Sequence, residues 1–290
     1  MQIDGTIDVE GLSFAYRAWG DAERPVILML HGFPDSPGTF TALGERLAAA
    51  GYRAVAPWLR GYGPTGGGAP KGLGQLGKDV VGMARALSDD RPVPVVAHDW
   101  GAAAACIAAT LEPDRFSHLV TLGLPHPAHF LSRAFADPVQ LRWSWYMWFF
   151  QLPELPESAL AGDDYALVDS LWRDWSPGLA RAPHRNELIE TFESGGLSGP
   201  LGYYRAVFAD TAGDDPADSA LYGPVGTRTL SVMGEQDGCI SPEYLDGQEY
   251  YWQAPITSTV LAGCGHFLHI ERPDEVGDLV LAFVEETVTV

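Results

Sequence analysis

Val96-Ala97-His98-Asp99-Trp100-Gly101-Ala102 is the stretch that decides the fold of this 290-residue chain. The apolar residues 93–97 are typical of a buried strand, and the alanine-rich residues after Gly101 are typical of a helix. A strand that turns abruptly into a helix around small-x-nucleophile-x-Gly forms a nucleophile elbow. Small residues at Ala97 and Gly101 permit the turn and leave the Asp99 side chain pointing out of the sheet. An aspartate at a strand end can also cap the next helix, so the motif alone leaves capping and catalysis open.

The same alternation of strand and helix extends outward on both sides of Asp99. Continuous apolar runs predict strands buried on both faces, and strands that alternate with helices of this length imply right-handed crossovers. The predicted strands span residues 6–9, 12–17, 25–30, 53–57, 93–97, 118–124, 228–234 and 258–261, and the predicted helices span residues 41–50, 76–88, 101–111 and 273–286. The sequence therefore predicts an α/β fold with a mostly parallel sheet that opens with an antiparallel hairpin.

Residues 127–222 differ from the rest of the chain in composition and periodicity. They are rich in Trp, Tyr, Leu, Pro and Asp, with helical spacing in places and no convincing buried strand. We predict a helical cap here, inserted between a first core segment (residues 1–126) and a second one (residues 223–290). The glycine-heavy residues 61–77 are predicted to form a loop near the strand ends.

An aspartate nucleophile needs a later carboxylate and a later histidine, in the chain order nucleophile, acid and base. Asp237 follows a predicted strand, and His266 follows the next strand within Gly263-Cys264-Gly265-His266. The flanking glycines suit a loop that projects the imidazole over the sheet. Of the eight histidines, His266 alone combines this position with a carboxylate partner. Both residues favour catalysis over helix capping for Asp99.

Backbone amides must also stabilise the oxyanion that forms during such a reaction. His31-Gly32-Phe33-Pro34 lies at the end of a predicted strand, so the N–H groups of Phe33 and Trp100 are the expected donors. At a saturated carbon, a serine would leave an ether that water does not readily cleave, whereas an aspartate leaves an ester that histidine-activated water hydrolyses. The aspartate therefore indicates opening of a C–O or C–halogen bond.

Five motifs resemble the epoxide hydrolase branch of the α/β-hydrolase family, in which haloalkane dehalogenases are close relatives. They are His31-Gly32-Phe33-Pro34-Asp35-Ser36, Arg60-Gly61-Tyr62-Gly63, His98-Asp99-Trp100-Gly101, Leu124-Pro125-His126-Pro127 and Gly263-Cys264-Gly265-His266. The resemblance covers nearly the whole chain. It implies an enzyme of epoxide detoxification that acts on an ether bond with water as the second substrate.

The resemblance also implies two cap tyrosines that polarise the epoxide oxygen. Tyr146 and Tyr204 stand at the matching places, in Tyr146-Met147-Trp148-Phe149 and Gly202-Tyr203-Tyr204-Arg205. A phenol suits this task because it stays protonated at neutral pH and donates to a developing alkoxide. Together with Phe33 and Trp100 they are the predicted substrate-binding residues. Both tyrosines also sit in aromatic surroundings where core packing is the usual role, so packing remains the alternative.

Two further functions stay open. A haloalkane dehalogenase would use the same triad and the Trp100 indole to bind the departing halide, but that family often has Asn at the place of Phe33 and needs no paired tyrosines. A ligand-binding protein that has lost catalysis is the other alternative, because a fold alone never establishes activity. The intact set of Asp99, Asp237 and His266 argues against it.

The bulk composition limits the partners. With 38 acidic and 18 basic residues the formal net charge is −20, so nucleic acid and membrane surfaces are not expected partners and a neutral or apolar small molecule is favoured. The most hydrophobic stretch, residues 143–152, is about half the length that spans a bilayer. A secretory signal is not expected from the first residues, and a monomer or homodimer is expected.

The three cysteines point to a reducing compartment. Cys106, Cys239 and Cys264 are odd in number and widely spaced, which fits neither a disulfide framework nor a zinc site. Reduced thiols in the cytoplasm are therefore expected. No metal or organic cofactor is predicted, since the sequence offers no metal-ligand cluster.

Overall fold

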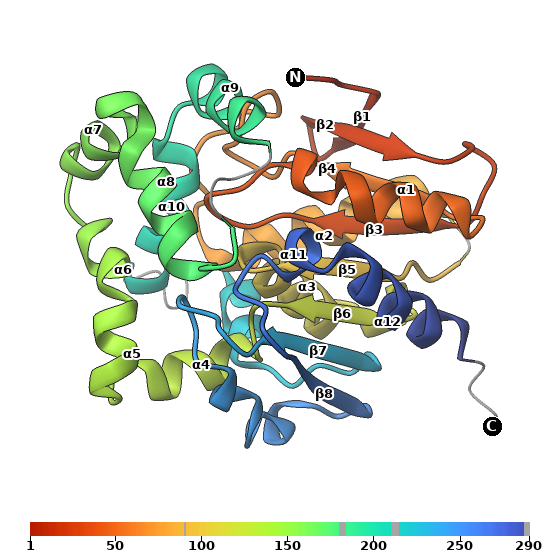
Figure 1. Cartoon of the computed structure of the whole chain (residues 1–290). Coiled ribbons are helices and arrows are strands. Elements are labelled where there is room, and N and C mark those ends of the chain that lie inside the picture. Colours follow the sequence, from red (N-terminus) through yellow and green to blue (C-terminus); the bar gives the residue numbers. More distant parts are fainter. Residues whose placement is uncertain (90, 180–183, 210–214, 287–290) are drawn as a thin grey trace.

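The computed structural model describes residues 1–89, 91–179, 184–209 and 215–286, and within these ranges the strands form one eight-stranded sheet (Figure 1). The strand order is β1-β2-β4-β3-β5-β6-β7-β8. The first strand pairs antiparallel with the second and the second with β4, whereas all the later pairs are parallel. The bounds are β1 Gly5–Val9, β2 Leu12–Trp19, β3 Val26–Leu30, β4 Arg53–Pro57, β5 Val95–His98, β6 Leu119–Leu122, β7 Thr229–Gly234 and β8 Ile256–Leu261. The predicted fold class, with its opening hairpin, is confirmed.

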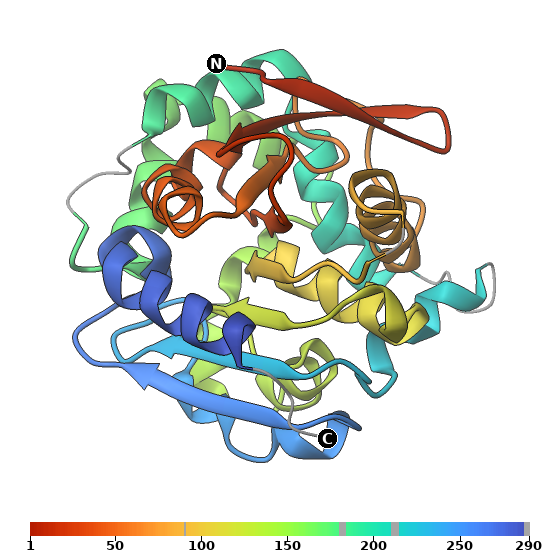
Figure 2. The same cartoon turned by 90° about the vertical axis from the view of Figure 1, so that its right-hand side faces the viewer.

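Helices cover both faces of the sheet, which is why the central strands carry continuous apolar runs. On one face lie α1 (Thr41–Ala49) and α12 (Pro273–Glu285), and on the other lie α2 (Leu73–Leu87) and α3 (Trp100–Leu111), as Figure 2 shows from the side. Alternate residues of β5 point to opposite faces of the sheet. Val95 and Ala97 belong to the hydrophobic cluster on the side of α2 and α3, whereas Val96 belongs to the cluster that packs on α1 and α12. Asp99 thus follows directly after a strand that is packed against helices on both faces.

Between β6 and β7 the described residues form helices and no strand, and these helices lie over one end of the sheet (left in Figure 1). Their bounds are α4 Pro127–Ala134, α5 Pro138–Trp143, α6 Trp145–Phe149, α7 Leu155–Ala161, α8 Ala166–Trp175, α9 Arg185–Gly195 and α10 Ser198–Phe208, followed by the 3-10 helix η4 at Pro216–Tyr222. We keep residues 127–222 as the proposed extent of the cap. No helix of the described part of the chain is both long enough and apolar enough to cross a membrane.

One local prediction is wrong. Residues 61–77 were expected to form a loop that passes into a helix at residue 76, but α2 already begins at Leu73. Gly74 lies directly against the backbone of Ala217, and Gly77 lies against the side chain of Ile107 on α3. A Cβ at either position would collide with these neighbours, so the glycines serve close helix packing here rather than loop flexibility.

Candidate active site

Asp99 occupies the sharp turn between β5 and α3. Its backbone has φ 49° and ψ −117°, a conformation that L-residues rarely adopt and that persists only where the surroundings enforce it. Gly32 lies against the Asp99 side chain, and Gly101 lies against the Leu30 backbone carbonyl, so both positions exclude a Cβ. The Asp99 side chain makes no capping hydrogen bond to α3. It instead accepts a hydrogen bond of 2.9 Å from the Phe33 amide, so helix capping is not its role.

The structure brings the predicted acid and base to Asp99. The Nδ1 atom of His266 lies 2.8 Å from Oδ2 of Asp237, and its Nε2 atom lies 3.7 Å from Oδ2 of Asp99. Oδ1 of Asp237 accepts hydrogen bonds from the amides of Cys239 (2.7 Å) and Ile240 (2.9 Å), which fix the carboxylate. Because that carboxylate only accepts, Nδ1 of His266 carries a proton and Nε2 is directed at Asp99.

Burial and charge act against each other at these residues. Burial alone raises the pKa of Asp99, but the hydrogen bond and charge of His266, the charge of His98 and the Phe33 amide bring it below its ordinary value. Burial lowers the pKa of His266, yet the charge and hydrogen bond of the neighbouring Asp237 carboxylate raise it well above 6.5 overall. The arrangement therefore holds Asp99 ionised beside a proton-binding imidazole.

The two predicted oxyanion donors differ in what they contact. The Phe33 amide already binds Oδ1 of Asp99, the oxygen that faces away from His266. Trp100 opens α3 next to the elbow, but the described structure contains no hydrogen bond from it to the Asp99 carboxylate. Its ring packs edge-on against Tyr204, with ring centroids 5.0 Å apart. The Phe33 side chain is fully buried against Tyr204 and Phe150 and does not line the cavity beside Asp99.

Tyr146 on α6 and Tyr204 on α10 meet above Asp99. Their rings lie 5.7 Å apart and nearly perpendicular, and both side chains are buried. The Tyr146 hydroxyl lies 3.2 Å from Sγ of Cys239, whereas the Tyr204 hydroxyl has no hydrogen-bond partner by geometry among the described residues. Burial, together with the Asp99 charge and other neighbours, raises the pKa of both phenols well above 10. Both therefore remain O–H donors.

A narrow cavity connects these groups. Its polar lining comes from Asp99, Tyr146, Tyr204 and the indole of Trp100. The rest of the wall is apolar and consists of Leu73, Ala103, Leu124, Pro127, Phe130, Leu131, Met147, Val207 and Leu221. Such a cavity favours a small apolar ligand with one polar group near Asp99.

The sequence missed one side chain of the site. Cys239 stands two residues after Asp237, is fully buried, and places its thiol between Tyr146 and the Asp237–His266 pair. All three cysteines are free thiols and are buried. Burial raises the pKa of Cys239 in spite of the nearby His266, so it remains a thiol rather than a thiolate.

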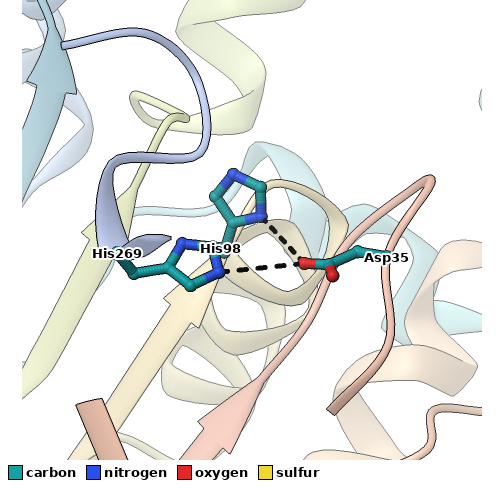
Figure 3. A group of neighbouring side chains, drawn as sticks. All are labelled: Asp35, His98 and His269. Atoms are coloured by element: carbon teal, nitrogen blue, oxygen red, sulfur yellow. Dashed lines mark ion pairs between the residues drawn. The ribbon is translucent and has the colours of Figure 1, made fainter. Parts of the chain in front are cut away.

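The prediction that the chain offers no metal-ligand cluster needs correction. Asp35, His98 and His269 meet below the elbow, and Asp237, Cys239 and His266 form a second group; in each group the ligating atoms lie within 4.8 Å of one another. The residues of the first group are far apart in sequence, and in the second group His266 lies 29 residues from Asp237, so no local spacing could reveal either group. The second group consists of the acid and the base of the triad with the neighbouring thiol. The first, shown in Figure 3, lies outside the cavity.

Comparison with known proteins agrees with this fold. A family model described as alpha/beta hydrolase fold matches residues 25–273. Epoxide hydrolase 3 of Xenopus tropicalis is 32% identical over 288 residues, which cover 95% of this chain and 76% of that protein. Epoxide hydrolase 4 of Mus musculus is 30% identical over 286 residues, which cover 95% of this chain and 77% of that protein.

Solved structures give the same result. An epoxide hydrolase of Bacillus megaterium in complex with an inhibitor is 25% identical with a TM-score of 0.79, covering 97% of this chain and 100% of that chain. A laboratory-evolved variant of a potato epoxide hydrolase is 28% identical with a TM-score of 0.78, covering 99% and 100%. This chain therefore belongs to the α/β-hydrolase family and, within it, to the epoxide hydrolases, which are hydrolases acting on ether bonds.

Proposed function

We propose that this enzyme converts an apolar or aromatic epoxide to a vicinal diol through a covalent ester on Asp99. The observation that carries the proposal is the meeting of one carboxylate and two phenols around a single apolar cavity. The carboxylate is a nucleophile for an epoxide carbon, and the phenols are donors for its oxygen. No other polar side chain of the described residues lines that cavity, apart from the Trp100 indole.

In the first half-reaction, Tyr146 and Tyr204 hold the epoxide oxygen while Oδ2 of Asp99 attacks a ring carbon. The C–O bond of the epoxide breaks, and the alkoxide takes a proton from one of the two phenols, which recovers a proton from solvent. The lowered pKa of Asp99 supports this step because it keeps the nucleophile ionised. The Tyr146 hydroxyl must turn from Cys239 to the substrate, and a thiol is a weak acceptor that gives it up readily.

In the second half-reaction, His266 takes a proton from water, and the hydroxide attacks the ester carbonyl of Asp99. The acyl C–O bond then breaks, the departing diol oxygen takes the proton back from His266, and the Asp99 carboxylic acid loses its proton to solvent. Esterification removes the negative charge 3.7 Å from Nε2, so the pKa of His266 falls and the imidazole becomes a base. Asp237 orients the ring through Nδ1. The amides of Phe33 and Trp100 stabilise the oxyanion, with the 2.9 Å contact from Phe33 to Oδ1 as support for the former.

The alternatives find less support. A haloalkane dehalogenase would need halide donors at Trp100 but not two buried phenols. Among the described residues, the Tyr204 hydroxyl in the cavity wall has no hydrogen-bond partner by geometry. A ligand-binding protein would not need the strained backbone at Asp99. We further propose a cytoplasmic enzyme, a monomer or homodimer, and three free, buried thiols support the reducing compartment.

The test combines substrate choice with isotope labelling. Purified enzyme is given an aromatic epoxide and a 1-haloalkane in parallel, and diol and halide are measured. A single turnover of the epoxide in heavy-oxygen water is then followed by mass spectrometry of the peptide that contains Asp99. We expect diol from the epoxide, no label in the first diol, and label in the Asp99 carboxylate. Halide release without diol, or label in the first diol, would overturn the function or the covalent step respectively.

A further inference from the structure

The acid of the triad is held by a peptide unit that also contacts the proposed cap. Oδ1 of Asp237 accepts hydrogen bonds from the amides of Cys239 and Ile240. The Cys239 carbonyl, which belongs to the same peptide unit as the Ile240 amide, accepts a hydrogen bond of 2.8 Å from Nε2 of Gln140. Because a peptide unit is planar, its carbonyl and its N–H do not turn independently. Gln140 and Asp237 therefore hold opposite edges of one rigid plane.

Gln140 lies on α5, and its side-chain amide is directed mainly at the loop after Asp237. The residue is 1% exposed. Its Nε2 also donates to Oγ of Ser144 at 3.0 Å, and its Oε1 accepts from the Ser241 amide at 3.0 Å. The Cys239 carbonyl only accepts and the Ser241 amide only donates, so these partners fix which end of the amide is the nitrogen. Two of the three hydrogen bonds thus connect α5 to the loop that carries the acid.

These contacts form a continuous chain from α5 to the base of the triad. Gln140 donates to the peptide unit of Cys239 and Ile240, and that unit donates to Oδ1 of Asp237. The other oxygen of Asp237 lies 2.8 Å from Nδ1 of His266. No member of the chain is more than 2% exposed, and buried hydrogen bonds in series strengthen one another. A displacement at Gln140 would therefore reach the imidazole of His266.

A second contact ties the same loop to the start of α5. Asp137 caps this helix with Oδ1, and its Oδ2 accepts a hydrogen bond of 3.0 Å from the Tyr244 hydroxyl. Tyr244 lies in the 3-10 helix η5 (Pro242–Leu245), which directly follows the segment bound by Gln140. The loop after Asp237 is thus fastened to α5 at two points.

Tyr146 on α6 is held mainly by other contacts. Its ring packs against Trp175 and Tyr204, with centroids 4.8 Å and 5.7 Å apart. The contact of its hydroxyl with the Cys239 thiol has to break in the proposed reaction in any case. A disturbance of the loop after Asp237 would therefore impair His266 more than it impairs this phenol.

We propose that Gln140 is a positioning residue for the second half-reaction: it orients Asp237, and through Asp237 the imidazole of His266, for ester hydrolysis. This inference rests on the proposed function. Gln140 acts through the acid and does not line the cavity beside Asp99. The competing role is a purely structural amide that satisfies buried backbone groups, and such an amide would affect both half-reactions alike.

The first measurement needs no substrate and so does not depend on the proposed reaction. Q140M keeps the length of the side chain but removes its donors and its strong acceptor. Hydrogen exchange of the full chain is followed by NMR at the single amides of Cys239 and Ile240, which bind Asp237 and not Gln140. We expect both amides to exchange at least about tenfold faster in Q140M than in the wild type. Unchanged exchange at both amides would overturn the proposal.

Gln248 provides a matched control, because it is a buried glutamine that joins two other segments. It is 0% exposed, its Oε1 accepts from the His126 amide at 2.9 Å, and its Nε2 donates to Oγ of Ser258 at 3.2 Å. We expect Q248M to lower stability but to leave unchanged both the exchange of the two amides that bind Asp237 and the ratio of the half-reactions. Equal changes in Q140M and Q248M would show that loss of any buried amide has this effect, which overturns the positioning role.

The second measurement separates the half-reactions. Rapid-quench experiments compare ester formation on Asp99 with ester hydrolysis in the wild type, Q140M and Q140N. Q140N keeps an amide that is too short to reach both backbone groups, and it replaces Q140M in both measurements if Q140M does not fold. We expect either variant to slow hydrolysis at least about tenfold more than ester formation, so that the ester accumulates.

Equal slowing of both steps would overturn the positioning role of Gln140. A wild type that forms no ester with any epoxide would overturn the proposed function instead. In that case the exchange rates alone decide whether Gln140 holds Asp237.

Discussion

At the scale of single residues, Tyr204 links the structure most directly to the chemistry. Its side chain is 2% exposed, its hydroxyl has no protein partner by geometry within the described residues, and it lines the same cavity as Asp99. A buried hydroxyl without a partner is costly, so such a group is usually kept for a ligand or a bound water. The packing alternative explains the ring of Tyr204 but leaves its hydroxyl unexplained.

The neighbouring Tyr203 provides a matched control for this inference. Its hydroxyl donates to the Arg60 carbonyl at 2.8 Å, away from the cavity. We expect Y204F and Y146F to lower kcat/KM for the epoxide by about 100-fold each, since each removes one donor to the developing alkoxide. Y203F should cost about 1 kcal/mol of unfolding free energy and leave kcat/KM within about twofold. Steady-state diol formation and urea unfolding measure both; equal losses of activity in Y203F and Y204F would contradict the prediction.

At the scale of secondary structure, the elbow depends on the close approach of β3 to the start of α3. The Cα of Gly101 faces the Leu30 carbonyl, and a β-carbon there would collide with the backbone of a central strand. We expect G101A to lower the free energy of unfolding by about 1–3 kcal/mol and to displace Asp99 from the Phe33 amide. Urea denaturation and diol formation report the two effects.

The control for this change is a glycine of ordinary backbone whose close neighbours all belong to the helix that it ends. Gly162 ends α7 with φ −70°, and its nearest neighbour for an added Cβ is the Ser158 carbonyl at 3.1 Å. We expect G162A to change stability by no more than about 1 kcal/mol, with activity unchanged. A G101A protein as stable and active as the wild type would show that the elbow does not require its glycine.

Most of the elements were predictable because their patterns are local. The strand of residues 53–57 has the predicted bounds, and those of residues 25–30 and 228–234 differ by one residue at the first position. Capping signals and apolar runs carry this information within a few residues. The glycines of α2 led to the wrong prediction of a loop. They are required by close contacts with Ala217 and Ile107, which are distant in sequence. Close packing between helices leaves no local pattern.

The candidate site was predictable to the extent that each group lies in a recognisable motif. Asp99, Asp237 and His266 meet as expected, and the Phe33 amide contacts Asp99. Cys239 could not be placed, because its contact with Tyr146 joins two segments 93 residues apart. The same holds for His98 and His269, whose shared partner Asp35 is visible only once the three segments are folded together.

At the scale of the whole molecule, two features discriminate against anionic substrates. The formal net charge of −20 gives the surface a negative field, and salt screens it. No lysine or arginine of the described residues lines the cavity beside Asp99, so an anionic ligand would be buried next to a carboxylate without a partner. The first effect acts at long range on association, and the second acts inside the cavity.

These two effects can be separated with an aromatic epoxide and its ring-carboxylate analogue. We expect kcat/KM for the carboxylate to be lower by at least about 100-fold, because an unpaired buried charge costs several kcal/mol. Raising the ionic strength from about 0.01 to about 0.15 M shortens the screening length from about 30 to about 8 Å and should recover only the smaller, long-range part. The variant L131K, which adds a cation at the half-buried wall of the cavity, should recover more. Equal kcat/KM for both epoxides would mean that the substrate binds with its ring outside this cavity.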